Sequence, residues 1–215
     1  MPGKPYLIGI AGPSCSGKSE IASRLGAAFQ ASILSLDSYY RDLSHLTMEE
    51  RARVNFDDPA AMNHDLVVSQ MRQLAAGIAI DKPVYDFARH RLGREVDHIV
   101  ATEFVVVEGL FTLHWPEVRE LLETRVFISA SHEVCLERRM ARDIRERGRT
   151  AQSVTEQYRE TVRPMCDRYV LPSEQHADLV LTGMNLLEQS AQCIIAWVGM
   201  KRRLRAGELA VTSAV

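Results

Sequence analysis

The segment Gly12-Pro13-Ser14-Cys15-Ser16-Gly17-Lys18-Ser19 satisfies the pattern G-x-x-x-x-G-K-[ST] of a phosphate-binding loop. It follows the apolar run 7–11 and opens the amphipathic stretch 18–29, which is the strand, loop and helix order that this pattern requires. The glycines let the backbone curl so that successive N–H groups face phosphate oxygens, and the helix start adds the positive end of its dipole. The sequence therefore predicts a nucleotide-phosphate site rather than an ordinary glycine turn.

Two side chains of this loop have predicted roles of their own. Lys18 is expected to reach the β- and γ-phosphates, and Ser19 to ligate Mg²⁺. For Cys15, a backbone N–H that binds phosphate is favoured over a reactive thiolate at the helix start. The residues predicted to bind the phosphates of ATP through this loop are Gly12, Ser14, Cys15, Ser16, Gly17, Lys18 and Ser19.

Composition excludes several classes of protein. The 215 residues include 26 Lys and Arg against 28 Asp and Glu, a net charge of −2, and 46% are hydrophobic. These values exclude collagen-like and disordered chains, and the missing basic excess argues against nucleic acid or an anionic membrane as the main partner. The four cysteines show no C-x-x-C pair, which argues against zinc and a disulfide framework. We expect a cytoplasmic protein with no membrane span.

Strand and helix patterns alternate along the chain. Short apolar runs predict buried parallel strands at 7–11, 33–36, 104–107, 125–128 and 178–181. Helical patterns occupy 18–29, 63–76, 117–123, 133–147, 153–169 and 186–203. This order predicts an α/β fold, a doubly wound parallel sheet with right-handed crossovers, in one domain spanning 1–215. Residues 78–100 break the alternation and predict a β-hairpin added to the sheet edge, and the tail 206–215 is expected to be disordered.

Two carboxylates are expected beside the phosphate loop. Asp37 follows the second predicted strand, and Glu108 ends the strongest apolar run. Ligands bind at the carboxyl ends of the strands in open α/β sheets. Asp37 can accept the proton of an attacking hydroxyl and help to hold a metal, and Glu108 is a second candidate ligand for Mg²⁺. The alternative for Asp37 is a helix cap.

A series of further motifs resembles the uridine kinases, also called uridine-cytidine kinases, within the P-loop kinases. The order and spacing match over about residues 6–181. Besides the loop, the resemblance is carried by Asp37-Ser38-Tyr39-Tyr40, Asn55-Phe56-Asp57-Asp58-Pro59, Pro83-Val84-Tyr85-Asp86-Phe87 with His90, Val107-Glu108-Gly109 and the run 142–149. The loop filling 13–16, the region 41–53 and the stretch after 184 depart from the family pattern.

The resemblance implies a role for each matching residue. Asp37 matches the catalytic base at the nucleoside 5′-hydroxyl, and Asp57 matches the carboxylate that binds the ribose hydroxyls. Tyr85 and His90 match residues that hydrogen-bond the pyrimidine. Without the resemblance, the sequence pattern favours Tyr85 as a core residue and His90 as a surface histidine. The full set implied to bind the nucleoside is Tyr40, Phe56, Asp57, Tyr85, Phe87, His90, Arg149 and Gln157.

Residues 137–149 are dense in arginine. On a helix, Arg138, Arg142, Arg145 and Arg149 recur at spacings of three or four and would share one face. The ordinary meaning is a solvated face, paired with Glu137, Asp143 and Glu146. In a kinase such a segment can instead be a lid that closes guanidinium groups over ATP and excludes water. The resemblance implies a helical arginine lid at about 138–150, with Arg142 catalytic and with phosphate contacts from Arg139 and Arg147.

The favoured hypothesis is therefore transfer of the γ-phosphoryl of ATP, or GTP, to uridine or cytidine, with Mg²⁺ held by Ser19, Glu108 and Asp37. The same loop serves phosphoribulokinase and pantothenate kinase, which remain alternatives with another acceptor. A non-catalytic nucleotide switch is a third, although the chain has no Asn-Lys-x-Asp base-reading sequence. The predicted partners are a nucleoside and a nucleoside triphosphate, and the resemblance implies a homo-oligomer, tetramer or dimer.

Overall fold

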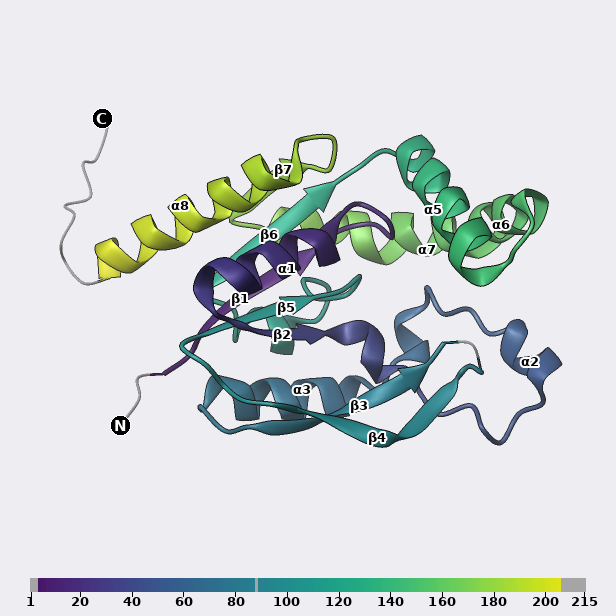
Figure 1. The fold of residues 1–215 in the computed structure, drawn as a ribbon, viewed down its shortest axis with the longest axis horizontal. Helices are drawn as coiled ribbons and strands as arrows, with labels where there is room; N and C mark the ends of the chain where they lie inside the picture. The colour runs from purple at the N-terminus through teal and green to yellow at the C-terminus, as the bar shows by residue number, and fades with distance from the viewer. Residues whose placement is uncertain (1–3, 88, 206–215) are drawn as a thin grey trace.

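A sheet of parallel strands forms the centre of the protein (Figure 1). The computed structural model describes residues 4–87 and 89–205. In that part of the chain the sheet has five strands in the order β2-β5-β1-β6-β7, and every neighbouring pair is parallel. The strands are β1 (Tyr6–Ala11), β2 (Ser32–Ser35), β5 (Phe104–Glu108), β6 (Thr124–Ser129) and β7 (Leu179–Thr182). The predicted doubly wound α/β fold is confirmed.

Helices cover the sheet and extend beyond it. The α-helices are α1 (Lys18–Phe29), α2 (Met48–Ala52), α3 (His64–Ala75), α4 (Pro116–Arg119), α5 (His132–Arg147), α6 (Ala151–Gln157), α7 (Arg163–Met165) and α8 (Leu187–Arg205). Short 3-10 turns lie at Leu36–Tyr39, Pro59–Ala61 and Leu171–His176. Among the described residues, no helix is long and apolar enough to cross a membrane.

The alternation of side chains along β1 produces a core on each face of the sheet. Tyr6, Ile8 and Ile10 pack with α1 and α8 on one face. Leu7 and Ala11 belong to the core on the other face, which includes α3 and the hairpin. Because both faces are covered, all six residues of β1 are buried, as expected for a central parallel strand.

The predicted hairpin exists, but its expected attachment to the sheet edge is wrong. Strands β3 (Ile80–Asp86) and β4 (Arg91–Ile99) pair only with each other, as a separate two-stranded sheet. The hairpin packs by its face instead, since Ile80 and Tyr85 are buried in the same core as α3. At the free edge of β2, the Ser32 N–H donates to the Thr102 hydroxyl.

Helix boundaries differ from the expected ranges where proline intervenes. The segment predicted as 117–123 is helical only over α4, which starts at Pro116. The helix predicted at 153–169 begins earlier, at Ala151, and contains π-helical turns at Tyr158–Val162 and Cys166–Val170 around α7. Pro164 lacks an N–H, so the usual hydrogen-bond ladder cannot pass through it. The tail 206–215 lies outside the described residues.

The base of α5 is fixed to its surroundings. The His132 ring bonds to the Tyr158 hydroxyl at 3.0 Å and to the Asp167 carboxylate at 2.8 Å. Arg138 donates to the carbonyl oxygens of Cys15 at 3.3 Å and of Gly183 at 2.8 Å. These bonds hold the first half of α5 against the phosphate loop. The position of this first half determines where the arginine side chains of the second half lie.

Candidate active site

The phosphate loop has the backbone geometry that its glycines allow. Gly12 has φ +146°, and a Cβ there would overlap the carbonyl oxygen of Ile128. Gly17 sits in the left-handed region, with φ +105°, immediately before α1. The ammonium of Lys18 donates to the Pro13 carbonyl at 2.8 Å. The first N–H groups of α1 have no partner within the helix, so they are available to an anion at this end.

Two carboxylates and a hydroxyl meet beside this loop. Ser19 donates to Glu108 at 3.2 Å, and both residues line the same cleft as Asp37. Burial, followed by the nearby charge of Glu108, raises the pKa of Asp37 to about 6, while Lys18 acts in the opposite direction. Asp37 lies within the 3-10 turn that follows β2 and not at the strand end itself.

The donor set of this cluster suits a hard cation. Mg²⁺ prefers oxygen ligands, and in nucleotide sites it is held by one or two carboxylates together with phosphates and waters. Ser19, Glu108 and Asp37 supply such oxygens. In the described ranges, no group of three or more His, Cys, Asp or Glu side chains could hold a metal without other ligands. The cluster therefore fits an ion that arrives with a nucleotide.

Aromatic rings gather at another part of the cleft. The Tyr40 ring lies 5.3 Å from Phe56 and 6.3 Å from Phe87, and Phe56 stacks on the His90 ring at 4.8 Å. Burial, followed by the charge of Arg147, lowers the pKa of His90 and so favours its neutral imidazole. These four side chains line the cleft and offer aromatic faces and edges against which a planar ring can pack.

Tyr85 is placed differently from the other predicted nucleoside-binding residues. It is 6% exposed and packs behind Tyr40, with ring centroids 5.4 Å apart, and it is not among the residues that line the cleft. Its hydroxyl is buried and has no hydrogen-bond partner among the described residues. A direct contact from Tyr85 to a base thus requires the rings that bury it to move, and these include Tyr40 and Phe87.

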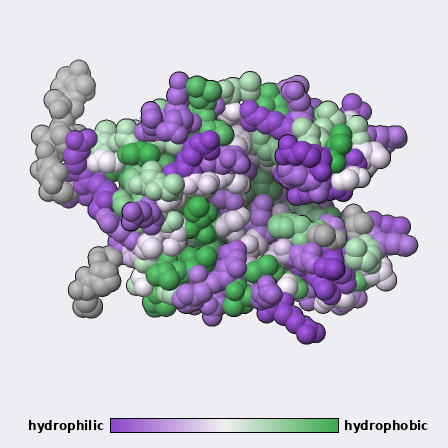
Figure 2. Space-filling model, in the orientation of Figure 1, coloured by the Kyte–Doolittle hydropathy of each residue, from purple (hydrophilic) through white to green (hydrophobic). Residues whose placement is uncertain are grey.

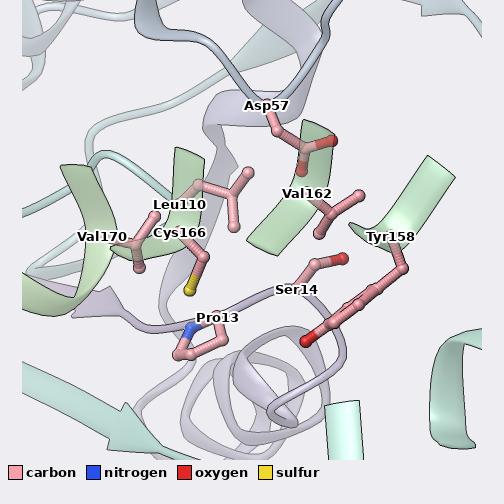
Figure 3. A pocket seen from close by; sticks show the side chains of 8 residues that line it. All are labelled: Pro13, Ser14, Asp57, Leu110, Tyr158, Val162, Cys166 and Val170. Atoms are coloured by element: carbon pink, nitrogen blue, oxygen red, sulfur yellow. The ribbon is translucent and has the colours of Figure 1, made fainter. Parts of the chain in front are cut away.

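Asp57 reaches the phosphate loop from a distant segment. Figure 3 shows it on one side of a small cavity, with Pro13 and Ser14 on the opposite side. The remaining wall is mostly apolar and comes from Leu110, Tyr158, Val162, Cys166 and Val170. Burial raises the pKa of Asp57, and Arg139 and Arg142 oppose this shift. Within the part of the chain that the structure describes, its carboxylate accepts no hydrogen bond from the protein, so its oxygens are available to a ligand with paired hydroxyls.

A cleft of about 770 Å³ joins these groups. Figure 2 shows the molecule hollowed between the α5–α6 side and the hairpin side. The cleft brings together most of the predicted site; Gly12, Ser16, Gly17 and Tyr85 are absent from its wall. It is lined by Ser14, Cys15, Lys18, Ser19, Asp37, Tyr40, Phe56, Asp57, Phe87, His90, Glu108, Leu110, Arg139, Arg142, Glu146, Arg147, Arg149 and Gln157.

The arginines of α5 do not share one face as expected. Arg138 contacts carbonyl oxygens of the phosphate loop, and Arg145 points outward to Glu146. Arg149 lies beyond the helix, because Gly148 ends it in the left-handed conformation. Arg139, which is 7% exposed, donates to Ser14 at 3.3 Å and to Gln157 at 3.3 Å.

Three residues, two in the cleft wall and one buried behind it, are not predicted as functional. Leu110 and Glu146 line the cleft, and Asp143 is fully buried among the arginines. The sequence does contain a signal for Asp143, since Arg139 and Arg147 lie four residues before and after it. Nothing in the local sequence marks Leu110 as a cleft residue.

Known proteins resemble this chain in sequence and in fold. The model of the phosphoribulokinase/uridine kinase family matches residues 7–188. The chain belongs to the phosphoribulokinase/uridine kinase family. A protein named uridine kinase from Aliivibrio fischeri (strain MJ11) is 42% identical over 182 residues, which cover 81% of this chain and 85% of that protein. A uridine kinase from Clostridium novyi (strain NT) is 39% identical over 181 residues, 83% of this chain and 87% of that protein.

Solved structures support the fold of this member of the phosphoribulokinase/uridine kinase family. The phosphoribulokinase from Rhodobacter spheroides superposes with a TM-score of 0.63 at 12% identity, over 85% of this chain and 73% of that one. A D-glycerate 3-kinase from Cryptococcus neoformans superposes with a TM-score of 0.58 at 13% identity, over 77% and 79% of the two chains. At such identities the likeness concerns the fold alone.

Proposed function

We propose that this protein transfers the γ-phosphoryl group of ATP to the 5′-hydroxyl of uridine or cytidine and so forms UMP or CMP. The observation that carries the proposal is the continuity of one cleft, which joins the phosphate loop at Lys18, the carboxylates Asp37 and Asp57, and the ring surface around Tyr40. Relatives about 40% identical over most of the chain carry the name uridine kinase.

Asp37 has the environment expected of a general base. Its pKa of about 6 leaves the carboxylate ionised at pH 7, yet more basic than an exposed aspartate. A hydroxyl that donates its proton to Asp37 becomes a better nucleophile toward the γ-phosphorus. Lys18 and Arg142 supply positive charge where negative charge develops on the transferring group.

Selection of the acceptor rests on the other part of the cleft. Asp57 can accept both ribose hydroxyls, and Tyr40, Phe56, Phe87 and His90 form a surface for a planar base. A pocket that pairs the polar edge of a base discriminates strongly, since a wrong base leaves buried groups without partners. Neither a sugar phosphate nor pantothenate has a planar aromatic ring to place there.

Mg²⁺ fits beside Ser19, Glu108 and Asp37, where it would neutralise charge on the nucleotide phosphates.

ATP is the proposed donor, with GTP as the alternative. A homo-oligomer and a cytoplasmic location stay predictions.

A substrate panel tests the function. ADP release is measured with uridine, cytidine, adenosine, guanosine, ribulose 5-phosphate and pantothenate as acceptors, and Lys18→Ala serves as the control for a contaminating kinase. We expect turnover with uridine and cytidine only. Preferred turnover of ribulose 5-phosphate or pantothenate, or of none of the six, would refute the proposal.

A further inference from the structure

A single carboxylate lies at the centre of the cleft's arginines. Asp143 on α5 is 0% exposed, and four guanidinium groups approach its two oxygens. Nε of Arg142 is 2.9 Å away, and Nε of Arg139 is 3.6 Å away. Nη1 of Arg147 is at 3.5 Å and Nη1 of Arg149 at 3.6 Å. Asp143 is thus a fully buried partner shared by four cations that come from two different segments.

The backbone of Asp143 contributes to the same arrangement. Gly148 ends α5 with φ +62° and donates its N–H to the carbonyl oxygen of Asp143. The N–H of Arg149 donates to that same oxygen at 3.2 Å. These bonds turn the chain back at the end of the helix, and this turn brings the Arg149 side chain to the Asp143 carboxylate.

The charges around Asp143 do not balance. Four guanidinium groups that line the cleft approach Asp143. Two further carboxylates of the cleft wall, Asp57 and Glu146, also act on these arginines, so positive charge still exceeds negative charge here. The surplus of positive charge adjoins the phosphate loop, since Arg139 donates to the hydroxyl of Ser14. Four close guanidinium groups repel one another, and a shared buried anion reduces this repulsion while part of their charge remains available to a ligand.

We propose that Asp143 is the positioning residue of these arginines: its carboxylate holds Arg139, Arg142 and Arg147 in the arrangement that meets the triphosphate and the transferring phosphoryl group, and it holds Arg149 toward the nucleoside. This inference rests on the proposed function and adds to it a residue that touches neither substrate. Asp143 acts through Arg139, Arg142, Arg147 and Arg149, and a buried carboxylate is suited to this because solvent does not screen it.

The test variant is Asp143→Asn, which keeps the shape of the side chain and removes its charge. We expect kcat to fall at least about tenfold and KM for ATP to rise, because the guanidinium groups that Asp143 arranges face the phosphates. KM for uridine should rise less than KM for ATP, since only Arg149 of the four arginines belongs to the set implied to bind the nucleoside. Glu137→Gln is the matched control: it removes the same charge from an exposed position of the same helix and should behave as the wild type.

Two further measurements separate positioning from a purely structural role. In an Arg142→Gln background, Asp143→Asn should cost clearly less than in the wild type, because coupled residues are not additive. Asp143→Glu keeps the charge and should give a kcat between the wild-type and Asn values. Additive effects, or a Glu variant as impaired as the Asn variant while both remain folded by circular dichroism, would overturn the proposal.

ATP affinity distinguishes this inference from the proposed function. Calorimetric titration with ATP needs no acceptor, so it reports on the arginines even if uridine is not a substrate. Weaker ATP binding by Asp143→Asn than by Glu137→Gln supports positioning, whatever the acceptor panel shows. Wild-type ATP affinity together with wild-type kcat in the Asn variant would contradict it. Should the Asn variant not fold, the longer pair Asp143→Glu and Asp143→Gln carries the test: the charged Glu variant should keep more kcat and ATP affinity than the Gln variant, and equal values in the two would refute the proposal.

Discussion

Replacing Asp37 by Asn should make the ligand-free protein more stable while it removes activity. The folded protein holds this carboxyl at a pKa of about 6, compared with 3.8 in an unperturbed aspartate, because of burial and the nearby Glu108. The charged form is therefore disfavoured by folding. Asn has nearly the same shape and carries no charge, so the variant avoids this destabilisation.

The magnitude of the stability difference follows from the pKa shift of Asp37. About two pKa units at about 1.36 kcal/mol each correspond to roughly 3 kcal/mol. The folded state binds the proton more tightly than the unfolded state, so the free energy of unfolding decreases as the pH rises from about 4 to about 6. The destabilisation is complete above about pH 7 and disappears as the pH falls below about 4. For a chain of this size, roughly 3 kcal/mol corresponds to a Tm difference of about 6–12 °C.

Urea denaturation at several pH values measures the effect. Wild type and Asp37→Asn are compared without nucleotide and with EDTA, between pH 4 and pH 8, where the m-values should agree. The stability advantage of the Asn variant should grow by roughly 2.5 kcal/mol from the acid end to the neutral end, because part of the destabilisation is already present at pH 4. An advantage that does not change with pH would refute the raised pKa and, with it, the physical basis for Asp37 as a base.

The other predictions concern catalysis. Asp37→Asn should lower kcat at least about a hundredfold while the uridine KM changes little; near-normal turnover would remove the base role. For the wild type, kcat/KM for uridine should decrease as the pH falls below about 6, because Asp37 becomes protonated, and a profile flat down to pH 5 would argue against that base. Lys18→Ala should abolish phosphoryl transfer, and appreciable remaining activity would contradict the loop assignment. His90→Ala should raise KM for uridine and cytidine more than KM for ATP; equal effects would assign the residue to the protein surface.

The sequence predicts those parts of the site that depend on local pattern. The loop Gly12–Ser19 and the acidic ends of two strands follow from chain order, because parallel strands place their carboxyl ends at one edge. Asp37 and Glu108 accordingly line one cleft with Lys18. Asp57 lies across a small cavity from Ser14 because of how the loop that follows α2 packs at this edge. Only the family motif indicates a site role for Asp57.

Features fixed by tertiary packing could not be predicted. The spacing of Arg138, Arg142 and Arg145 gives a helical face, but spacing does not determine which guanidinium meets a carbonyl and which meets solvent. The hairpin was expected at the sheet edge because alternation reveals strands without revealing their partners. Its face packs instead on the core through Ile80 and Tyr85. This packing depends on contacts between residues that are far apart in the sequence.

The position of the transferred phosphate tests the account most directly. The product formed from uridine and ATP is analysed by ³¹P NMR and mass spectrometry, and 5′-deoxyuridine is assayed beside it. We predict uridine 5′-monophosphate as the product, with 5′-deoxyuridine acting as a competitive inhibitor that is not phosphorylated. Phosphorylation at the 2′ or 3′ oxygen, or ATP turnover driven by 5′-deoxyuridine, would contradict the placement of the 5′-hydroxyl between Asp37 and the phosphate loop.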